Sequence, residues 1–130
     1  MKGKIEELNR IAESQYEVLV EMVEALRKAQ EDDDDDALEE AERAIDEDAL
    51  SVQVRSAWTN PGFPLGPDEY CILLSTGGPA TRIVGKIGLH FEPVTATLEA
   101  QDWFTVWTPW FGADEEVLLE YAGRFFACVE

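Results

Sequence analysis

The stretch YCILLSTGGPATRIVGKI, from Tyr70 to Ile87, decides the fold. Its first six residues form a short, continuous apolar run, which is typical of a buried β-strand. The Thr-Gly-Gly-Pro-Ala segment that follows has the composition of a tight turn, and residues 81–87 indicate a returning strand. The sequence therefore predicts a β-hairpin, and with it an antiparallel sheet in this half of the chain.

Other strands and a last helix are expected on both sides of this hairpin. Residues 50–54 alternate apolar and polar side chains, which predicts a half-buried strand, and a Pro- and Gly-rich loop follows over residues 59–69. Residues 94–101 predict a further strand. Three acidic residues over 114–116 then open a helix. The expected buried stripe of that helix is Val117, Leu118, Tyr121, Ala122 and Phe125.

The first 48 residues have a helical pattern instead. No Pro or Gly interrupts residues 5–29, and apolar residues recur at steps of three and four, which predicts one long helix. Adjacent aspartates repel, so Asp32–Asp36 should end it. A short second helix should follow, with Asp36 as N-cap and Glu39 completing a capping box. The predicted apolar stripes are Ile5, Leu8, Ala12, Leu19, Met22, Leu26 and Ala29, widened by Tyr16, Val18 and Val23, and then Leu38, Ala41 and Ile45.

The predicted fold class is α+β, with an antiparallel sheet of about four strands, a C-terminal helix packed on it and an N-terminal acidic helical hairpin. The change from a helical, acidic pattern to a strand-like one divides the chain into an acidic helical region over residues 1–48 and an α+β core domain over residues 49–130. The pattern leaves open whether the hairpin packs on the sheet or projects from it. It also allows the heptad-like seam of the first helix to pair with a second copy as a homodimer.

The charge of the chain restricts its partners. Its 130 residues include 28 acidic and 10 basic side chains, for a net charge of -18, and residues 1–48 alone hold 18 acidic and 6 basic ones. Such a chain repels nucleic acid and anionic membranes and is attracted to basic surfaces, including grooves that hold nucleic acid. There is no signal-peptide pattern and no apolar run of spanning length. We expect a cytoplasmic protein in which Cys71 and Cys128 are reduced and buried, with a disulfide between them as the alternative.

No motif supplies a catalytic or metal site. The turn over residues 77–79 lacks the Gly-Lys-Ser/Thr of a phosphate-binding loop and leads into a strand. The aspartate run fails as an EF-hand, because Ala37 stands where Gly is needed and Arg43 where an acidic ligand is needed. His90 is the only histidine, and Cys71 lies in an apolar strand, where a thiol is usually inert. We expect a protein that is not an enzyme and uses no cofactor or metal ion, although diffuse divalent-cation binding to the aspartates stays open.

The acidic helices have two interpretations. The first is a solvated face that keeps the protein soluble. The second is DNA mimicry, because duplex DNA carries one charge per about 1.7 Å of its axis and two acidic helices side by side can approximate two phosphate rows. The contact residues predicted for mimicry are Glu6, Glu13, Glu17, Glu21, Glu24, Glu31, Asp32, Asp33, Asp34, Asp35, Asp36, Glu39, Glu40, Glu42 and Asp46.

The tryptophans give a rival function. Trp103, Trp107 and Trp110 fall within eight residues, more than one strand face buries comfortably. They form either an aromatic minicore or a protein-binding surface in which Trp107 and Trp110 are the anchors. The second arrangement would belong to a non-catalytic structural or interaction protein.

Two segments carry a resemblance to a known group of proteins. CILLSTGGPATRIVG (residues 71–85) and EAQDWFTVWTPWF (residues 99–111) resemble small proteins encoded by phages and prophages, and the resemblance covers roughly residues 50–121. It implies an accessory protein of a mobile element, acting in the cytoplasm of a bacterial host cell. It further implies an anti-CRISPR or anti-restriction inhibitor that mimics DNA and binds a CRISPR effector or another basic nucleic-acid-binding complex. From the charge of the chain, we expect it to bind neither nucleic acid nor membrane directly. The long acidic N-terminal extension departs from the pattern of that group.

Overall fold

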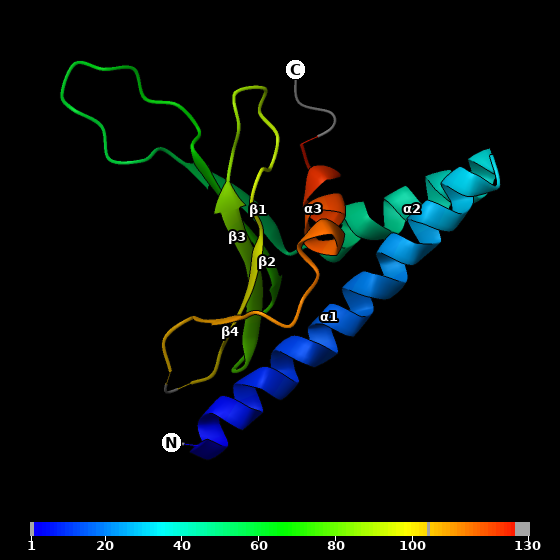
Figure 1. Ribbon diagram of the computed structural model, residues 1–130, viewed down its shortest axis with the longest axis horizontal. Coiled ribbons are helices and arrows are strands. Elements are labelled where there is room, and N and C mark those ends of the chain that lie inside the picture. Colours follow the sequence, from blue (N-terminus) through cyan, green and yellow to red (C-terminus); the bar gives the residue numbers. More distant parts are fainter. Residues whose placement is uncertain (1, 104, 127–130) are drawn as a thin grey trace.

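The computed structural model describes residues 2–103 and 105–126. Its elements confirm the α+β fold class, with three helices and five strands along the described chain (Figure 1). In chain order they are α1 (Lys2–Glu31), α2 (Asp35–Asp48), β1 (Ser51–Arg55), β2 (Glu69–Ser75), β3 (Ala80–Lys86), β4 (Thr97–Gln101), β5 (Thr108–Trp110) and α3 (Glu115–Gly123).

The sheet is an antiparallel meander in the order β1-β2-β3-β4-β5, so each strand pairs with its neighbour in sequence. The predicted hairpin is β2 and β3, in which Ile72 lies opposite Ile83. Gly77 and Gly78 turn the chain with φ angles of 110° and 126°, a conformation that favours glycine, which confirms the structural role of this turn. The strand that the sequence did not predict is β5, within the aromatic segment.

The helices lie on one face of the sheet and the other face is open (Figure 1). In β2 the helix-facing residues Tyr70, Ile72 and Leu74 are buried, whereas the residues between them are half-buried. One core joins this face to α1 and α3, so the N-terminal helix packs on the sheet. The second helix packs mainly on α1, and the turn between the two helices extends beyond the sheet (Figure 1).

The buried stripe of α1 follows the predicted pattern, except that Tyr16 and Met22 are half-buried and two other residues are exposed. Leu8, Ala12, Leu19, Val23, Leu26 and Ala29 are buried as predicted. Ile5 and Val18 are exposed: Ile5 lies near the end of the helix, and Val18 is turned about 100° from Leu19 toward solvent. The seam that could have paired with a second copy is therefore used within the chain.

The turn between α1 and α2 is shorter than predicted. The N-cap of α2 is Asp34, whose Oδ1 accepts a hydrogen bond from the Ala37 N–H at 3.1 Å, so the predicted Asp36 cap and its capping box with Glu39 are wrong. The chain reverses early because Asp33 adopts a left-handed conformation with φ of 50°, which Asp tolerates better than most residues.

Three other expectations need correction. The strand over residues 50–54 was expected to be half-buried, but most of β1 is exposed because it lies at the edge of the sheet. Helix α3 ends at Gly123, before the predicted stripe residue Phe125, which is half-buried in the turn that follows; the buried side chain of that turn is Phe126. Cys71 is a free thiol, half-buried on the open face of the sheet. Cys128 lies outside the described residues, so the predicted alternative of a disulfide with Cys71 also lies outside them.

Candidate functional site

The acidic hairpin, defined as residues 17–48, comprises the second half of α1, the turn and all of α2. Two local features make this like-charged sequence helical. Asp34 caps α2, and Asp35 and Asp36 lie in its first turn, where the helix dipole favours negative charge. At the end of α1, the Lys28 ammonium lies 3.4 Å from the Asp32 carboxylate and offsets part of the repulsion.

The net negative charge of the N-terminal region is confined to this hairpin. Residues 17–48 contain 15 acidic and 3 basic side chains, whereas residues 1–16 contain three of each. The first half of α1, which packs on the sheet, therefore has no net charge. The second half of α1, the turn and α2 together have a net charge of -12.

Folding α2 back along α1 concentrates this charge. Helix α2 packs on α1, and the two segments, residues 17–31 and 35–48, each extend about 21–22 Å along their axes. A net charge of -12 over that length is one charge per about 1.8 Å of axis, against about 1.7 Å for duplex DNA. The acidic hairpin therefore has the linear charge density of a duplex.

The carboxylates form a row on each helix. In α1, Glu17, Glu24 and Glu31 lie opposite the buried stripe, with Glu21 beside them, since each residue turns the helix by about 100°. In α2, the row opposite the buried stripe holds Asp36, Glu40 and Glu47. Since the buried stripe of α2 faces α1, we place the rows on opposite edges of the hairpin rather than next to one another. Two packed helices are about 20 Å across, which is close to the width of a DNA duplex.

Some predicted contact residues are neutralised within the chain. The guanidinium of Arg124, which follows α3, lies 2.8 Å from the Asp46 carboxylate and 3.4 Å from that of Glu42. Glu39 pairs with Arg43 at 3.1 Å. Within residues 2–103 and 105–126, the predicted contact carboxylates that form no ion pair are Glu6, Glu13, Glu17, Glu21, Glu24, Glu31, Asp33, Asp34, Asp35, Asp36 and Glu40.

The predicted tryptophan anchors are part of the fold. The Arg82 guanidinium lies 4.2 Å from the centre of the Trp107 ring, and the Trp110 ring packs against Tyr16 with centroids 5.5 Å apart. Both tryptophans are half-buried at the β5 end of the sheet. The exposed tryptophans are Trp58 and Trp103, and neither is one of the predicted anchors. The sequence does hold one indication that Trp58 is exposed, because this residue lies directly before a Pro- and Gly-rich loop.

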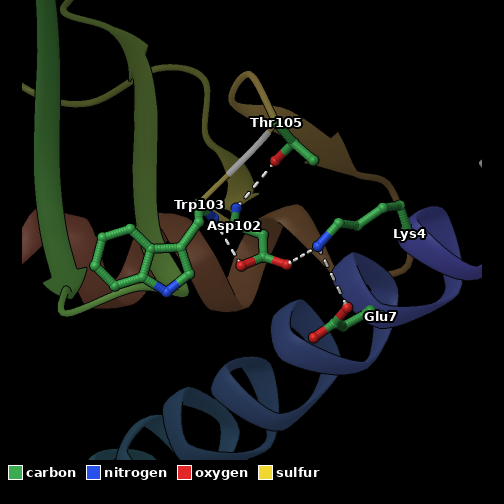
Figure 2. Close-up of polar contacts among 5 residues, drawn as sticks. All are labelled: Lys4, Glu7, Asp102, Trp103 and Thr105. Carbon is green, nitrogen blue, oxygen red and sulfur yellow. Dashed lines mark hydrogen bonds and ion pairs between the residues drawn. The ribbon is translucent and has the colours of Figure 1, made fainter.

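A polar contact ties the first turn of α1 to the loop after β4 (Figure 2). The buried Asp102 carboxylate accepts from the Lys4 ammonium at 2.5 Å and from the Trp103 N–H at 2.7 Å. The hydrogen bond from Lys4 and the backbone N–H lower the pKa of Asp102 below its ordinary value, and the hydrogen bond to Asp102 raises the pKa of Lys4. Trp103 is thereby held over the hairpin turn, where a Cβ on Gly78 would lie 2.6 Å from its Nε1.

The open face of the sheet is a second, shallower candidate. It is hollowed by about 620 Å³, and its lining includes Arg55, Arg82 and Lys86, three of the four basic residues after residue 48. Two of them are paired on the same face: Arg82 lies 2.7 Å from Glu99, and Arg55 lies 2.8 Å from Glu69. Its net charge is therefore small, and it offers no concentrated site for an anion.

Potential metal ligands are not brought together in the part of the chain that the structure describes. No group of three or more His, Cys, Asp or Glu side chains there is arranged to hold a metal ion. His90 is exposed in the turn after β3, and no hydrogen bond joins it to Cys71 among the described residues. None of the described helices combines the length and the apolar character that crossing a bilayer requires.

Comparison with known proteins gives no match: no protein-family model fits the chain, and no curated protein or solved structure is significantly similar to it. The resemblance to phage-encoded proteins therefore stays a prediction. The function has to be argued from the surface of the molecule.

Proposed function

We propose that this protein is a non-catalytic inhibitor whose acidic hairpin occupies a basic, nucleic-acid-binding groove. The observation that carries the proposal is the linear charge density of residues 17–48, about one charge per 1.8 Å over about 22 Å. The resemblance to phage-encoded proteins supplies the class of target, a bacterial defence complex and, first among these, a CRISPR effector. The host cytoplasm is the compartment in which the inhibitor would act.

The physical basis is competition for the same cations. Lys and Arg side chains that line such a groove would meet carboxylates in place of phosphates, on both edges of a rod about as wide as a duplex. A length of about 22 Å matches about six base pairs at about 3.4 Å each. Binding should be fast through electrostatic steering and should weaken steeply as salt is raised.

The rest of the fold serves as the support of the hairpin. Helix α1 runs without interruption from the sheet to the tip, and its first half is fixed by core contacts and by the pair of Lys4 with Asp102. Arg124 joins α3 to α2 through Asp46 and Glu42. The hairpin is therefore held in a defined direction away from the sheet (Figure 1).

The test compares two variants with the same change of net charge. In the first, Asp35→Asn, Asp36→Asn and Glu40→Gln remove three carboxylates of the acidic hairpin that form no ion pair among the described residues. In the second, Glu6→Gln, Glu13→Gln and Glu116→Gln remove three exposed carboxylates outside it. Glu6 and Glu13 are predicted contacts from the sequence, but they lie on the neutral first half of α1, which this proposal leaves out of the contact surface. The cap Asp34 is kept in both, so that α2 still forms.

Each variant is tagged and used to capture its partner from bacterial lysate at about 0.1 M salt, with and without excess duplex DNA. We expect the wild type and the second variant to retain a nucleic-acid-binding complex that duplex DNA releases. The first variant should lose at least tenfold in recovery. Equal recovery by the two variants, or a partner indifferent to DNA and salt, would contradict the proposal.

A second candidate function rests on the loop between β1 and β2. Trp58, Phe63 and Leu65 are all exposed there, with Trp58 fully so. Such a surface fits a structural or interaction protein that binds an apolar pocket of its partner. Trp58→Ala should abolish capture of that partner and leave the DNA-competed complex unchanged, so the two functions are separable by experiment.

A further inference from the structure

The two edges of the sheet are protected to different degrees. The edge strand β5 has three residues, and one of them is Pro109, which cannot extend a hydrogen-bonded ladder. The edge strand β1 has five residues, no proline and one charged side chain, Arg55. No described segment pairs with its outer edge. A strand of this kind is a template for pairing with another chain.

The side chains of β1 are exposed on the helix-facing side of the sheet. Val52 pairs with Ile72 in register and therefore points toward the layer of the helices, yet Val52 and Val54 are 39% and 47% exposed. Leu50, just before the strand, is 57% exposed. These three residues make an apolar strip along an unpaired edge, and isolated monomers rarely retain both features together.

We propose that β1 pairs in antiparallel fashion with β1 of a second copy, about a twofold axis at Gln53, which would join two sheets into one. Val52 of each copy would then lie opposite Val54 of the other, which shields the apolar strip. The Gln53 side chains would meet at the axis, where amides can donate to and accept from each other. Ser51 would lie opposite Arg55, so no like charges would face each other directly.

The sequence of β1 favours a second copy as the occupant of this edge, because the strand is complementary to itself: valine lies opposite valine, and its one charged residue lies opposite a serine. The two Arg55 residues would lie about 13 Å apart, four residues along the strands. Each points to the open face of the sheet, where the Glu69 carboxylate of its own chain lies 2.8 Å away and offsets its charge. The Asp32–Asp36 run is separated from its own β1 by the length of α2, about 21 Å, which exceeds the Debye length of about 8 Å at physiological salt.

The first test is the oligomeric state, measured by sedimentation velocity from about 1 to 200 µM protein. We expect a concentration-dependent dimer that tightens as salt is raised, because salt screens the repulsion between two chains of charge -18. Val54→Lys should weaken the dimer at least tenfold, since an edge lysine blocks strand pairing. Leu89→Lys makes the same change of charge at a fully exposed turn residue and should leave the dimer unchanged.

The second test fixes the register in a background in which Cys71 and Cys128 are serine. Gln53→Cys should form an intermolecular disulfide under mild oxidation, because paired residues at the axis lie about 5.5 Å apart or less. Ser51→Cys should not, because its two copies would be about 13 Å apart. A wild type that is monomeric at 200 µM, or a dimer that is indifferent to Val54→Lys and links through residue 51, would overturn the proposal. Neither measurement involves the target, so failure here leaves the inhibitor function untouched.

Discussion

Replacing Ile45 by Ala should detach α2 while leaving the charge of the protein unchanged. Ile45 is fully buried and is the largest of the buried side chains of α2, the other being Ala41. The change removes three carbons, worth about 2.4 kcal/mol at about 0.8 kcal/mol per buried CH₂. The residual cavity brings the expected cost to about 3 kcal/mol. A 14-residue helix is marginal alone in water, so this loss exceeds what the remaining contacts of α2 can offset.

The assay is amide hydrogen exchange, resolved by residue. In the Ile45→Ala variant, residues 35–48 should lose protection while β2 and β3 keep theirs. Ile83→Ala is the matched control, because Ile83 is equally buried but lies in the central strand, so its loss should lower protection throughout the molecule. Ile45→Ala should also weaken the DNA-competed capture, since detached charges no longer have the density of a duplex. A variant that loses α2 yet captures as well as the wild type would refute the link between folding back and function.

Two further predictions concern the support of the hairpin. Gly85→Ala should cost about 2 kcal/mol or more in urea denaturation, because its Cβ would collide with the backbone carbonyl oxygen of Thr95, whereas Gly66→Ala meets open space and should be neutral or slightly stabilising. Asp102→Asn should destabilise the protein near pH 7. Because the pKa of Asp102 is lowered in the fold by Lys4, the difference between wild type and variant should be full above about pH 4 and shrink as pH falls through that pKa. A difference that stays constant down to pH 2 would show that the charge of Asp102 is not what stabilises this contact.

Long, uniform patterns in the sequence predicted most of the helices and the central hairpin. Helix α1 was predictable because no Pro or Gly occurs in it after Gly3, and the β2–β3 turn because two adjacent glycines tolerate positive φ angles. The N-cap of α2 was missed because five identical aspartates give no local signal that selects Asp34 over Asp36. The β5 strand was missed because three residues with a central proline resemble a loop.

The properties that depend on long-range packing could not be predicted. The exposure of β1 depends on its place at the edge of the sheet, which the alternation of residues 50–54 does not determine. The count of carboxylates was visible, but their density follows from α2 folding back along α1. The neutralisation of Glu42 and Asp46 comes from Arg124, about eighty residues away in sequence, and no spacing rule connects them.

The uneven charge along α1 has a consequence for how the protein meets a partner. The first 16 residues of the chain have no net charge, and the whole net negative charge of the N-terminal region lies beyond them. The centre of charge is therefore displaced from the centre of mass toward the tip of the hairpin. The molecule therefore has a large permanent dipole moment, directed along a helix that has no hinge. The field of a basic groove would rotate the approaching protein before contact, and a greater share of collisions would begin with the tip foremost.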